Sequence, residues 1–136
     1  MPLETLFSIA GLTAMIGWLA LLVSPYMPVW SNRIAGWLIP SVLAAGYVTL
    51  ALSHPPAQGG FDTLASVAEL FAQPAVLLAG WVHFLAFDLV VGAWICRSAR
   101  SAHVPFWMVL PCLPLTFLFG PAGFALYAGI RAARRT

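Results

Sequence analysis

Charged side chains are scarce in this chain. Only 7% of its 136 residues are Asp, Glu, Lys or Arg, while 62% are hydrophobic. Soluble domains carry roughly a quarter charged residues, so this composition excludes an ordinary soluble domain and predicts an integral, multi-pass membrane protein. The six basic residues are all arginines. A net charge of +2 gives no reason to expect a nucleic-acid partner, and lipid headgroups are the expected neighbours of the arginines.

Several motifs are also missing. No basic segment precedes the first apolar run, where Glu4 is the only charge, so we expect a retained helix and no cleaved signal peptide. No phosphate-binding glycine loop, serine elbow or nucleotide signature is present. Cys96 and Cys112 are the only cysteines, and no second Cys/His pair stands at metal-ligand spacing. We therefore expect free thiols, no metal and no cofactor.

Long apolar runs dominate what is present. A membrane-spanning helix needs about 20 mostly apolar residues, and we predict spans at about 5–23, 34–52, 76–96 and 106–130. Backbone polar groups in lipid must be satisfied within the protein, so these runs indicate helices. The sequence predicts an all-α fold, with residues 1–136 forming a single membrane domain of about four transmembrane helices.

The segment 62–72 (DTLASVAELFA) is too short to span a membrane. Its apolar residues recur at helical spacing, and Asp62 is positioned to cap the N-terminus of a helix. We predict a short interfacial helix between the second and third spans.

The distribution of the arginines does not determine the membrane orientation of four continuous spans. Such spans would divide the arginines equally between the two sides, so the positive-inside rule gives no answer. One side would hold Arg33, Arg97 and Arg100, and the other Arg131, Arg134 and Arg135. The alternative is that the proline-broken segment from Pro111 to Pro121 is re-entrant, which would gather all the arginines at one end.

The third predicted span contains His83 and Asp88. A carboxylate at the bilayer centre costs about 2.5–3.5 kcal/mol on insertion scales and marks a functional hypothesis. Five residues of helix separate the two side chains by about 140° and about 7.5 Å, so they cannot pair directly. One interpretation is that both form hydrogen bonds between helices; the other is that they form a functional site.

Small and aromatic residues accompany each of these polar side chains. The stripe of Asp88 includes Trp81, Phe84 and Gly92, and that of His83 includes Gly80 and Phe87. Small residues let a neighbouring helix approach closely. We therefore expect the third span to be central and to be contacted on two sides.

The fourth predicted span carries a second stripe of small and polar residues. It comprises Cys112, Thr116, Gly120, Gly123 and Tyr127. This stripe is either a helix-packing face or, together with the third span, the lining of a narrow intramembrane cavity. The prolines favour some cavity, because each removes a backbone donor and frees a carbonyl.

Three motifs together resemble a known family. They are GWVHFLAFDL at 80–89, PCL at 111–113 and FGPAG at 119–123, preceded by the pairs Leu6-Phe7 and Leu70-Phe71. In this order they are similar to the ABA-deficient-four-like family, whose plastid members are linked to neoxanthin formation. The chain resembles its bacterial members, which implies a bacterial inner membrane. Ala93 departs from the plant pattern, which has an arginine at this position.

The resemblance implies a carotenoid- or isoprenoid-associated protein, with cofactor-independent isomerisation of an epoxy-carotenoid as one hypothesis. That reaction needs an acid for the epoxide oxygen and a base for a vinylic proton. We assign these roles to Asp88 and His83. The expected substrate contacts are Trp81, Phe84, Phe87, Cys112, Thr116 and Tyr127, and the expected structural residues are Gly80, Gly92, Gly120, Pro121 and Gly123.

Two other functions stay open. The protein is alternatively a non-catalytic polyene or lipid binder, or an assembly factor of a membrane complex. The third hypothesis is a small transporter or proton-relay subunit that uses Asp88. The expected partners are the lipid bilayer, a carotenoid or other isoprenoid ligand, and further copies of the chain or a membrane complex.

Overall fold

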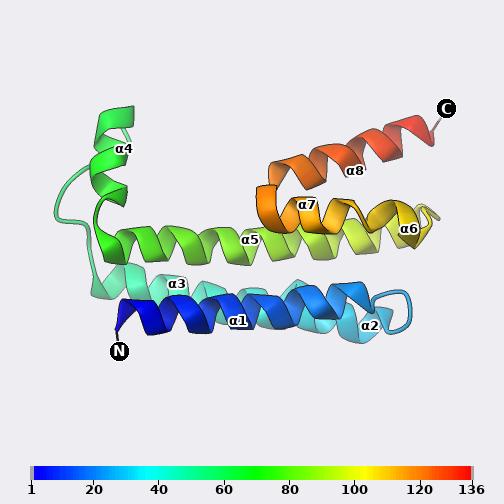
Figure 1. The fold of residues 1–136 in the computed structure, drawn as a ribbon, viewed down its shortest axis with the longest axis horizontal. Coiled ribbons are helices and arrows are strands. Elements are labelled where there is room, and N and C mark those ends of the chain that lie inside the picture. The colour runs from blue at the N-terminus through cyan, green and yellow to red at the C-terminus, as the bar shows by residue number, and fades with distance from the viewer. Residues whose placement is uncertain (1, 136) are drawn as a thin grey trace.

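The computed structural model describes residues 2–135, and no strand occurs among them. The predicted all-α class is confirmed. Three helices are long and apolar enough to cross a membrane: α1 (Leu3–Leu22), the continuous helix Pro28–Ser53, and α5 (Pro74–Ser101). They lie side by side along their whole length (Figure 1).

The second long helix combines three labelled elements. These are α2 (Pro28–Ser31), the π-helical segment η1 (Asn32–Leu38) and α3 (Ile39–Ser53). It begins earlier than the predicted residue 34, because Pro28 occupies the first turn, where a helix needs no N–H donor. In the π-helical segment the Oδ1 atom of Asn32 accepts a 2.7 Å hydrogen bond from Nη1 of Arg97. This bond ties the second helix to α5.

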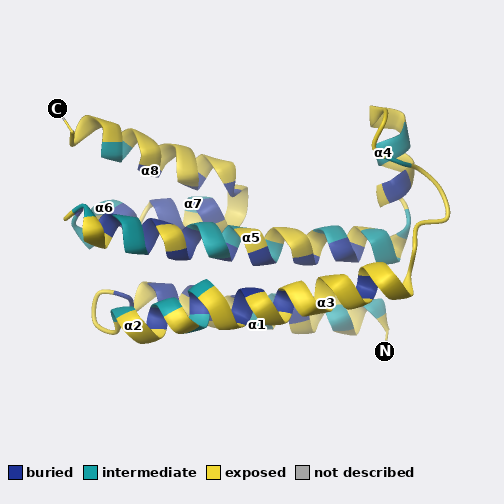
Figure 2. Cartoon of the chain, turned by 180° about the vertical axis from the view of Figure 1, so that it is seen from behind, coloured by how far each residue is buried: buried dark blue, intermediate teal, exposed yellow. Residues whose placement is uncertain are grey.

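Small residues allow α1 and α5 to pack closely. A Cβ atom at Gly17 would collide with the buried Leu89, and one at Gly92 would lie 2.9 Å from Trp18 and from Leu21. Figure 2 shows buried residues where the helices face one another and exposed residues on the outside. Large hydrophobic side chains are exposed on the outside of α1, with Leu12 at 69% and Ile16 and Leu19 at 56%, as expected for a surface that meets lipid.

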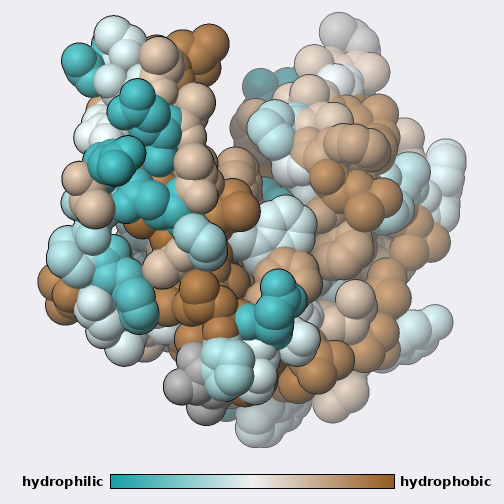
Figure 3. All heavy atoms as spheres, turned by 60° about the vertical axis from the view of Figure 1, so that its left-hand side comes forward, coloured by the Kyte–Doolittle hydropathy of each residue, from teal (hydrophilic) through white to brown (hydrophobic). Residues whose placement is uncertain are grey.

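The helix α4 (Leu64–Phe71) lies across the direction of the long helices (Figure 1). Thr63 caps it, and not Asp62 as expected: the Oγ1 atom of Thr63 accepts a hydrogen bond from the backbone N–H of Ser66 at 3.1 Å. Gln73 holds the preceding connection through bonds to the backbone of residues 57 and 58. Figure 3 brings this end forward and shows hydrophilic residues gathered over it. A short helix therefore lies between the second and third long helices, as predicted, and its interfacial position stays a prediction.

The fourth predicted span is not one continuous helix. It consists of α6 (Phe106–Val109), α7 (Cys112–Phe119) and α8 (Pro121–Ala133). The chain reverses at Gly120, so that α7 and α8 form a hairpin and the C-terminus returns toward α6 (Figure 1). The expectation of a single helix over 106–130 is corrected, because Pro121 has no N–H to continue the bonding of α7. The reversal of the chain is the arrangement that the re-entrant alternative requires.

The reversal separates positive from negative charge. The six arginines lie where η1 begins, where α5 ends and where α8 ends, which is one end of the bundle (Figure 1). We call this the arginine end. Glu4, Asp62 and Glu69 lie at the opposite end, on α1 and on or beside α4. The fourth acidic residue, Asp88, lies midway along α5.

Candidate functional site

Asp88, on α5, lies against the tip of the hairpin that α7 and α8 form. Its side chain is partly buried, and a Cβ atom placed on Gly120 would come within 2.6 Å of Oδ1 of Asp88. Glycine at the reversal therefore allows the hairpin backbone to rest directly on the carboxyl group. Pro121 follows as the first residue of α8. The structure thus brings together residues from two separate motifs, 80–89 and 119–123.

A cavity of about 540 Å³ opens beside Asp88, between α5 and the hairpin tip. We call it the Asp88 groove. Its lining residues are Trp81, Phe84, Leu85, Asp88, Phe117, Leu118, Phe119, Gly120 and Pro121. Asp88 is the only ionisable residue in this lining. Phe84 is 60% exposed and Phe119 is 64% exposed, so the groove opens at the surface of the molecule.

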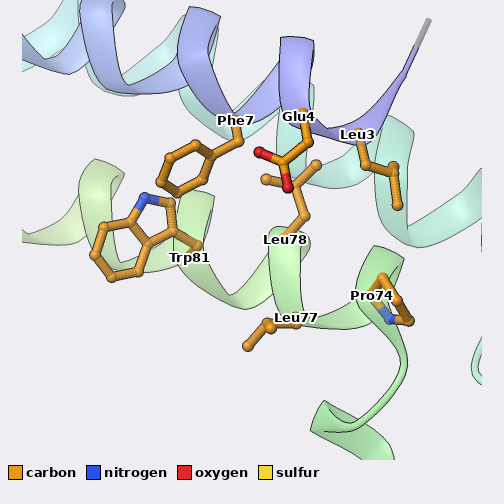
Figure 4. A pocket seen from close by; sticks show the side chains of 7 residues that line it. All are labelled: Leu3, Glu4, Phe7, Pro74, Leu77, Leu78 and Trp81. Carbon is orange, nitrogen blue, oxygen red and sulfur yellow. The ribbon is translucent and has the colours of Figure 1, made fainter.

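Two further apolar grooves adjoin the Asp88 groove. The Glu4 groove, of about 330 Å³, is lined by Leu3, Glu4, Phe7, Pro74, Leu77, Leu78 and Trp81 (Figure 4). The Trp18 groove, of about 340 Å³, is lined by Met15, Trp18, Leu19, Leu22, Leu110, Leu113, Pro114 and Phe117. Each shares one aromatic residue with the Asp88 groove, Trp81 in the first case and Phe117 in the second. The Asp88 groove therefore borders each of the other two grooves at one aromatic side chain.

The two shared aromatic residues, Trp81 and Phe117, each contact an aromatic ring of α1. The rings of Phe7 and Trp81 have centroids 5.9 Å apart, and Figure 4 shows them facing each other between α1 and α5. The rings of Trp18 and Phe117 meet edge-on at 5.5 Å. Glu4 contributes the only carboxylate of its groove. An elongated apolar molecule would therefore meet aromatic walls and two separated acidic groups.

His83 lies on another face of α5. Its side chain is exposed and does not line the Asp88 groove. The imidazole ring instead contacts three aromatic rings, with centroid distances of 4.9 Å to Phe87, 5.7 Å to Tyr47 and 6.2 Å to Phe84. Phe87 is likewise absent from the lining of the groove. The expected acid and base therefore do not face one another across a shared cavity.

The polar residues of the fourth predicted span pack inside the hairpin. Cys112 and Thr116 have no exposed surface. The Thr116 hydroxyl donates a 2.7 Å hydrogen bond to the Cys112 carbonyl, and the Cys112 thiol donates one to the Met108 carbonyl at 3.6 Å. Gly123 lies directly against Thr116 Oγ1. Cys112 and Thr116 do not line the Asp88 groove: both side chains are buried, and that of Thr116 lies against α8.

Tyr127 belongs to a polar cluster at the arginine end. Its hydroxyl donates a 2.7 Å hydrogen bond to Ser98 Oγ, and Arg131 Nη1 donates to the same oxygen at 3.0 Å. Tyr127 is 1% exposed and does not line the Asp88 groove, in contrast to its expected role as a substrate contact. The cluster joins α5 to α8. The sequence signal for it was the spacing of Tyr127 and Arg131, which places both on one face of a helix.

The remaining predicted structural glycines lie at close helix contacts. A Cβ atom at Gly80 would lie 2.6 Å from the Phe71 ring of α4, and Gly92 faces Trp18 and Leu21 of α1. Gly80 and Gly92 therefore let neighbouring helices pack closely against α5. Both cysteines are buried free thiols.

The fold and the Asp88 groove define a class of protein: a helical membrane protein that has three helices long and apolar enough to cross a membrane and a groove that contains one carboxyl group. A family model described as ABA DEFICIENT 4-like matches residues 5–127, and the chain belongs to this family. The predicted resemblance is confirmed by that match. No curated protein and no solved structure shows a significant match.

Proposed function

We propose that this protein binds a carotenoid or similar isoprenoid that enters the Asp88 groove from the bilayer. Membership of the ABA DEFICIENT 4-like family is consistent with a carotenoid-related membrane protein. The adjoining Glu4 and Trp18 grooves accommodate the rest of an elongated apolar chain. In this proposal the oxygen-bearing part of the ligand lies against Asp88.

One observation carries the proposal: the only ionisable residue in an aromatic groove open to lipid is Asp88. A carboxyl group at this depth costs free energy unless it finds a polar partner. A hydroxyl or epoxide oxygen of the ligand supplies that partner by accepting a hydrogen bond from the protonated carboxyl group. The indole and phenyl rings of Trp81, Phe84 and Phe119 supply flat apolar surface for a polyene.

The same geometry defines how an isomerisation would proceed. Because no second ionisable residue lines the groove, both proton transfers would involve Asp88. One carboxyl oxygen gives its proton to the epoxide oxygen as the C–O bond breaks. The other oxygen takes the vinylic proton as the new C=C bond forms. The carboxyl group ends as it began, and neither oxidant nor reductant is consumed.

Coexpression with an epoxy-carotenoid pathway tests the proposal. The protein is purified from the pigmented host, and its bound pigments and the total pigments of the host are separated by chromatography. We expect pigment to copurify with the unaltered protein and to fall at least about tenfold in Asp88→Asn. Such a fall corresponds to about 1.4 kcal/mol. Glu69→Gln, which removes an acid on α4 outside the groove, is the matched control.

The products separate binding from catalysis. A new isomer that appears with the unaltered protein and with His83→Ala, but not with Asp88→Asn, would support isomerisation by Asp88 alone. Pigment retention without a new isomer would support a binding protein. If the unaltered protein retains no pigment, or Asp88→Asn retains as much as the unaltered protein does, the proposal is wrong.

Proton relay is the second candidate function. It is favoured by the hairpin, because half-helices that meet beside a mid-membrane ionisable residue also occur in transporters. The apolar lining of the Asp88 groove favours a ligand-binding role instead. Proton flux into liposomes containing the purified protein, abolished by Asp88→Asn and unchanged by Glu69→Gln, would favour the relay.

A further inference from the structure

A separate cleft of about 240 Å³ lies between α5 and α8 at the arginine end. It is lined by Trp94, Tyr127, Ala128, Arg131, Ala132 and Arg135. We propose that this cleft binds an anionic phospholipid, with the phosphate at Arg131 and Arg135 and an acyl chain along Trp94 and the alanines. The site is distinct from the Asp88 groove, with which it shares no lining residue.

The charge distribution favours an anionic ligand here. All six arginines lie at this end, and none of the four acidic residues does. Among residues 2–135, no side-chain carboxylate at this end offsets the positive charge. Basic clefts between membrane helices bind anionic lipid headgroups, and each arginine near the surface contributes about 1 kcal/mol.

The two arginines of the cleft lie at the end of α8: Arg131 is in its last turn, and Arg135 lies just beyond its last residue, Ala133. Ala128, Arg131 and Ala132 follow the i, i+3, i+4 spacing of one helical face. Arg131 is positioned by its bonds to Ser98 Oγ and, at 3.5 Å, to the Tyr127 hydroxyl. Both bonds use Nη1, whereas a guanidinium group carries five N–H donors. Arg131 therefore binds a phosphate without giving up these contacts.

The apolar part of the cleft suits an acyl chain. Trp94 is 41% exposed, and its ring contacts Phe124 and Tyr127 with centroids 5.7 Å away in each case. Tryptophan is typical of the membrane interface, where one part of the ring is apolar and its N–H is polar. Ala128 and Ala132 are exposed and small, which leaves the floor of the cleft open. The cleft is thus apolar at one end and basic at the other, as a phospholipid is.

Native mass spectrometry of the purified full-length protein tests the site. The probes are dioleoyl phosphatidylglycerol and, as the uncharged counterpart, dioleoyl phosphatidylcholine. We expect the protein to retain phosphatidylglycerol preferentially and Arg135→Gln to weaken that binding about fivefold, from the contribution of one arginine. Arg33→Gln is the control, because Arg33 stacks on the Trp30 ring and does not line the cleft.

A second variant separates a built cleft from diffuse attraction. Ala132→Leu keeps every charge and fills the floor of the cleft, so it should also weaken phosphatidylglycerol binding several-fold. Asp88→Asn should leave this binding unchanged, whatever it does to pigment. Equal retention of the two lipids, an Arg33→Gln effect as large as that of Arg135→Gln, or no effect of Ala132→Leu would each overturn the proposal.

Discussion

The three long helices and the hairpin of α7 and α8 are both strongly apolar, but they differ in how the chain runs along the bundle. The long helices run the full length of the bundle, whereas the hairpin enters from the arginine end and returns to it (Figure 1). The difference lies in a few residues at the reversal. Gly120 allows close approach to Asp88, and Pro121 starts a new helix in place of continuing α7. Both regions are hydrophobic enough for a membrane, and the residues at the reversal distinguish the hairpin from the long helices.

The reversal at Gly120 also shapes the two proposed binding sites, the Asp88 groove and the basic cleft between α5 and α8. Irregular backbone at membrane depth must be covered by protein, and here α5 covers Gly120, the buried residue of the reversal, with the face that carries Asp88. The same reversal returns α8 to the arginine end. The Asp88 groove and the basic cleft therefore both depend on the hairpin, and the following predictions test that dependence.

The largest expected effect concerns topology. The positive-inside rule places the arginine end in the cytoplasm, so a C-terminal reporter should lie there and a reporter inserted at residues 57–60 should lie on the opposite side. Paired fusions to a cytoplasm-active and an exterior-active reporter measure this. Finding both positions on the same side would mean that α8 continues across the membrane, and the comparison between spans and hairpin would fail.

The next effect concerns the packing of the hairpin. Gly123→Ala would place a Cβ atom against Thr116 Oγ1 and 2.6 Å from the Cys112 carbonyl oxygen. We expect a loss of about 1–3 kcal/mol in the free energy of unfolding, as for other overpacked sites. Gly129→Ala in the same helix meets no atom within 4 Å and should be neutral or stabilise by up to about 1 kcal/mol. Unfolding in a denaturing detergent titration compares them, and equal effects would contradict the close packing of α7 on α8.

The sequence predicted those features of the fold that depend on local pattern. Apolar runs identified the long helices, and the motifs around Asp88 and Gly120 identified the family. The spacing of His83 and Asp88 predicted that they occupy different faces of one helix. Local pattern could not decide between a continuous fourth span and a re-entrant one, because both bury the same apolar residues. That choice depends on contacts between Gly120 and Asp88 and between Gly123 and Thr116, which only the tertiary structure shows.

The sequence also predicted only part of the candidate site, because the rest depends on tertiary contacts. Trp81, Phe84, Asp88, Gly120 and Pro121 all line the groove, because each lies where α5 meets the hairpin tip. Cys112, Thr116 and Tyr127 share a stripe in a continuous helix, but the break at Gly120 leaves Cys112 and Thr116 in α7 and places Tyr127 in α8. Their roles then differ: Cys112 and Thr116 are buried, with the Thr116 hydroxyl bonded to the Cys112 carbonyl, and Tyr127 bonds to Ser98.

A smaller effect is expected at the hairpin tip itself. Gly120→Ala would introduce a Cβ atom 2.6 Å from Asp88 Oδ1, so either the carboxyl group or the tip must move. We expect pigment retention to fall by about tenfold or less, about 1.4 kcal/mol, because the groove is distorted and not removed. Pigment bound per protein after purification measures the effect, with Gly129→Ala as the control. Unchanged retention would show that ligand binding does not depend on the contact between the tip and Asp88.

The smallest effect is expected at His83, which lies on a different face of α5 from Asp88. His83→Ala removes a ring that contacts Phe87 and Tyr47 but does not line the Asp88 groove, so pigment retention should change by less than about twofold, or about 0.4 kcal/mol. His83→Phe keeps the ring contacts and distinguishes lost packing from lost imidazole chemistry. If His83→Ala and His83→Phe both abolish binding or isomerisation as Asp88→Asn does, the imidazole group acts on the ligand despite lying outside the groove. The hairpin would then not be the only element that selects the functional face of α5, and a ligand would have to reach both faces of that helix.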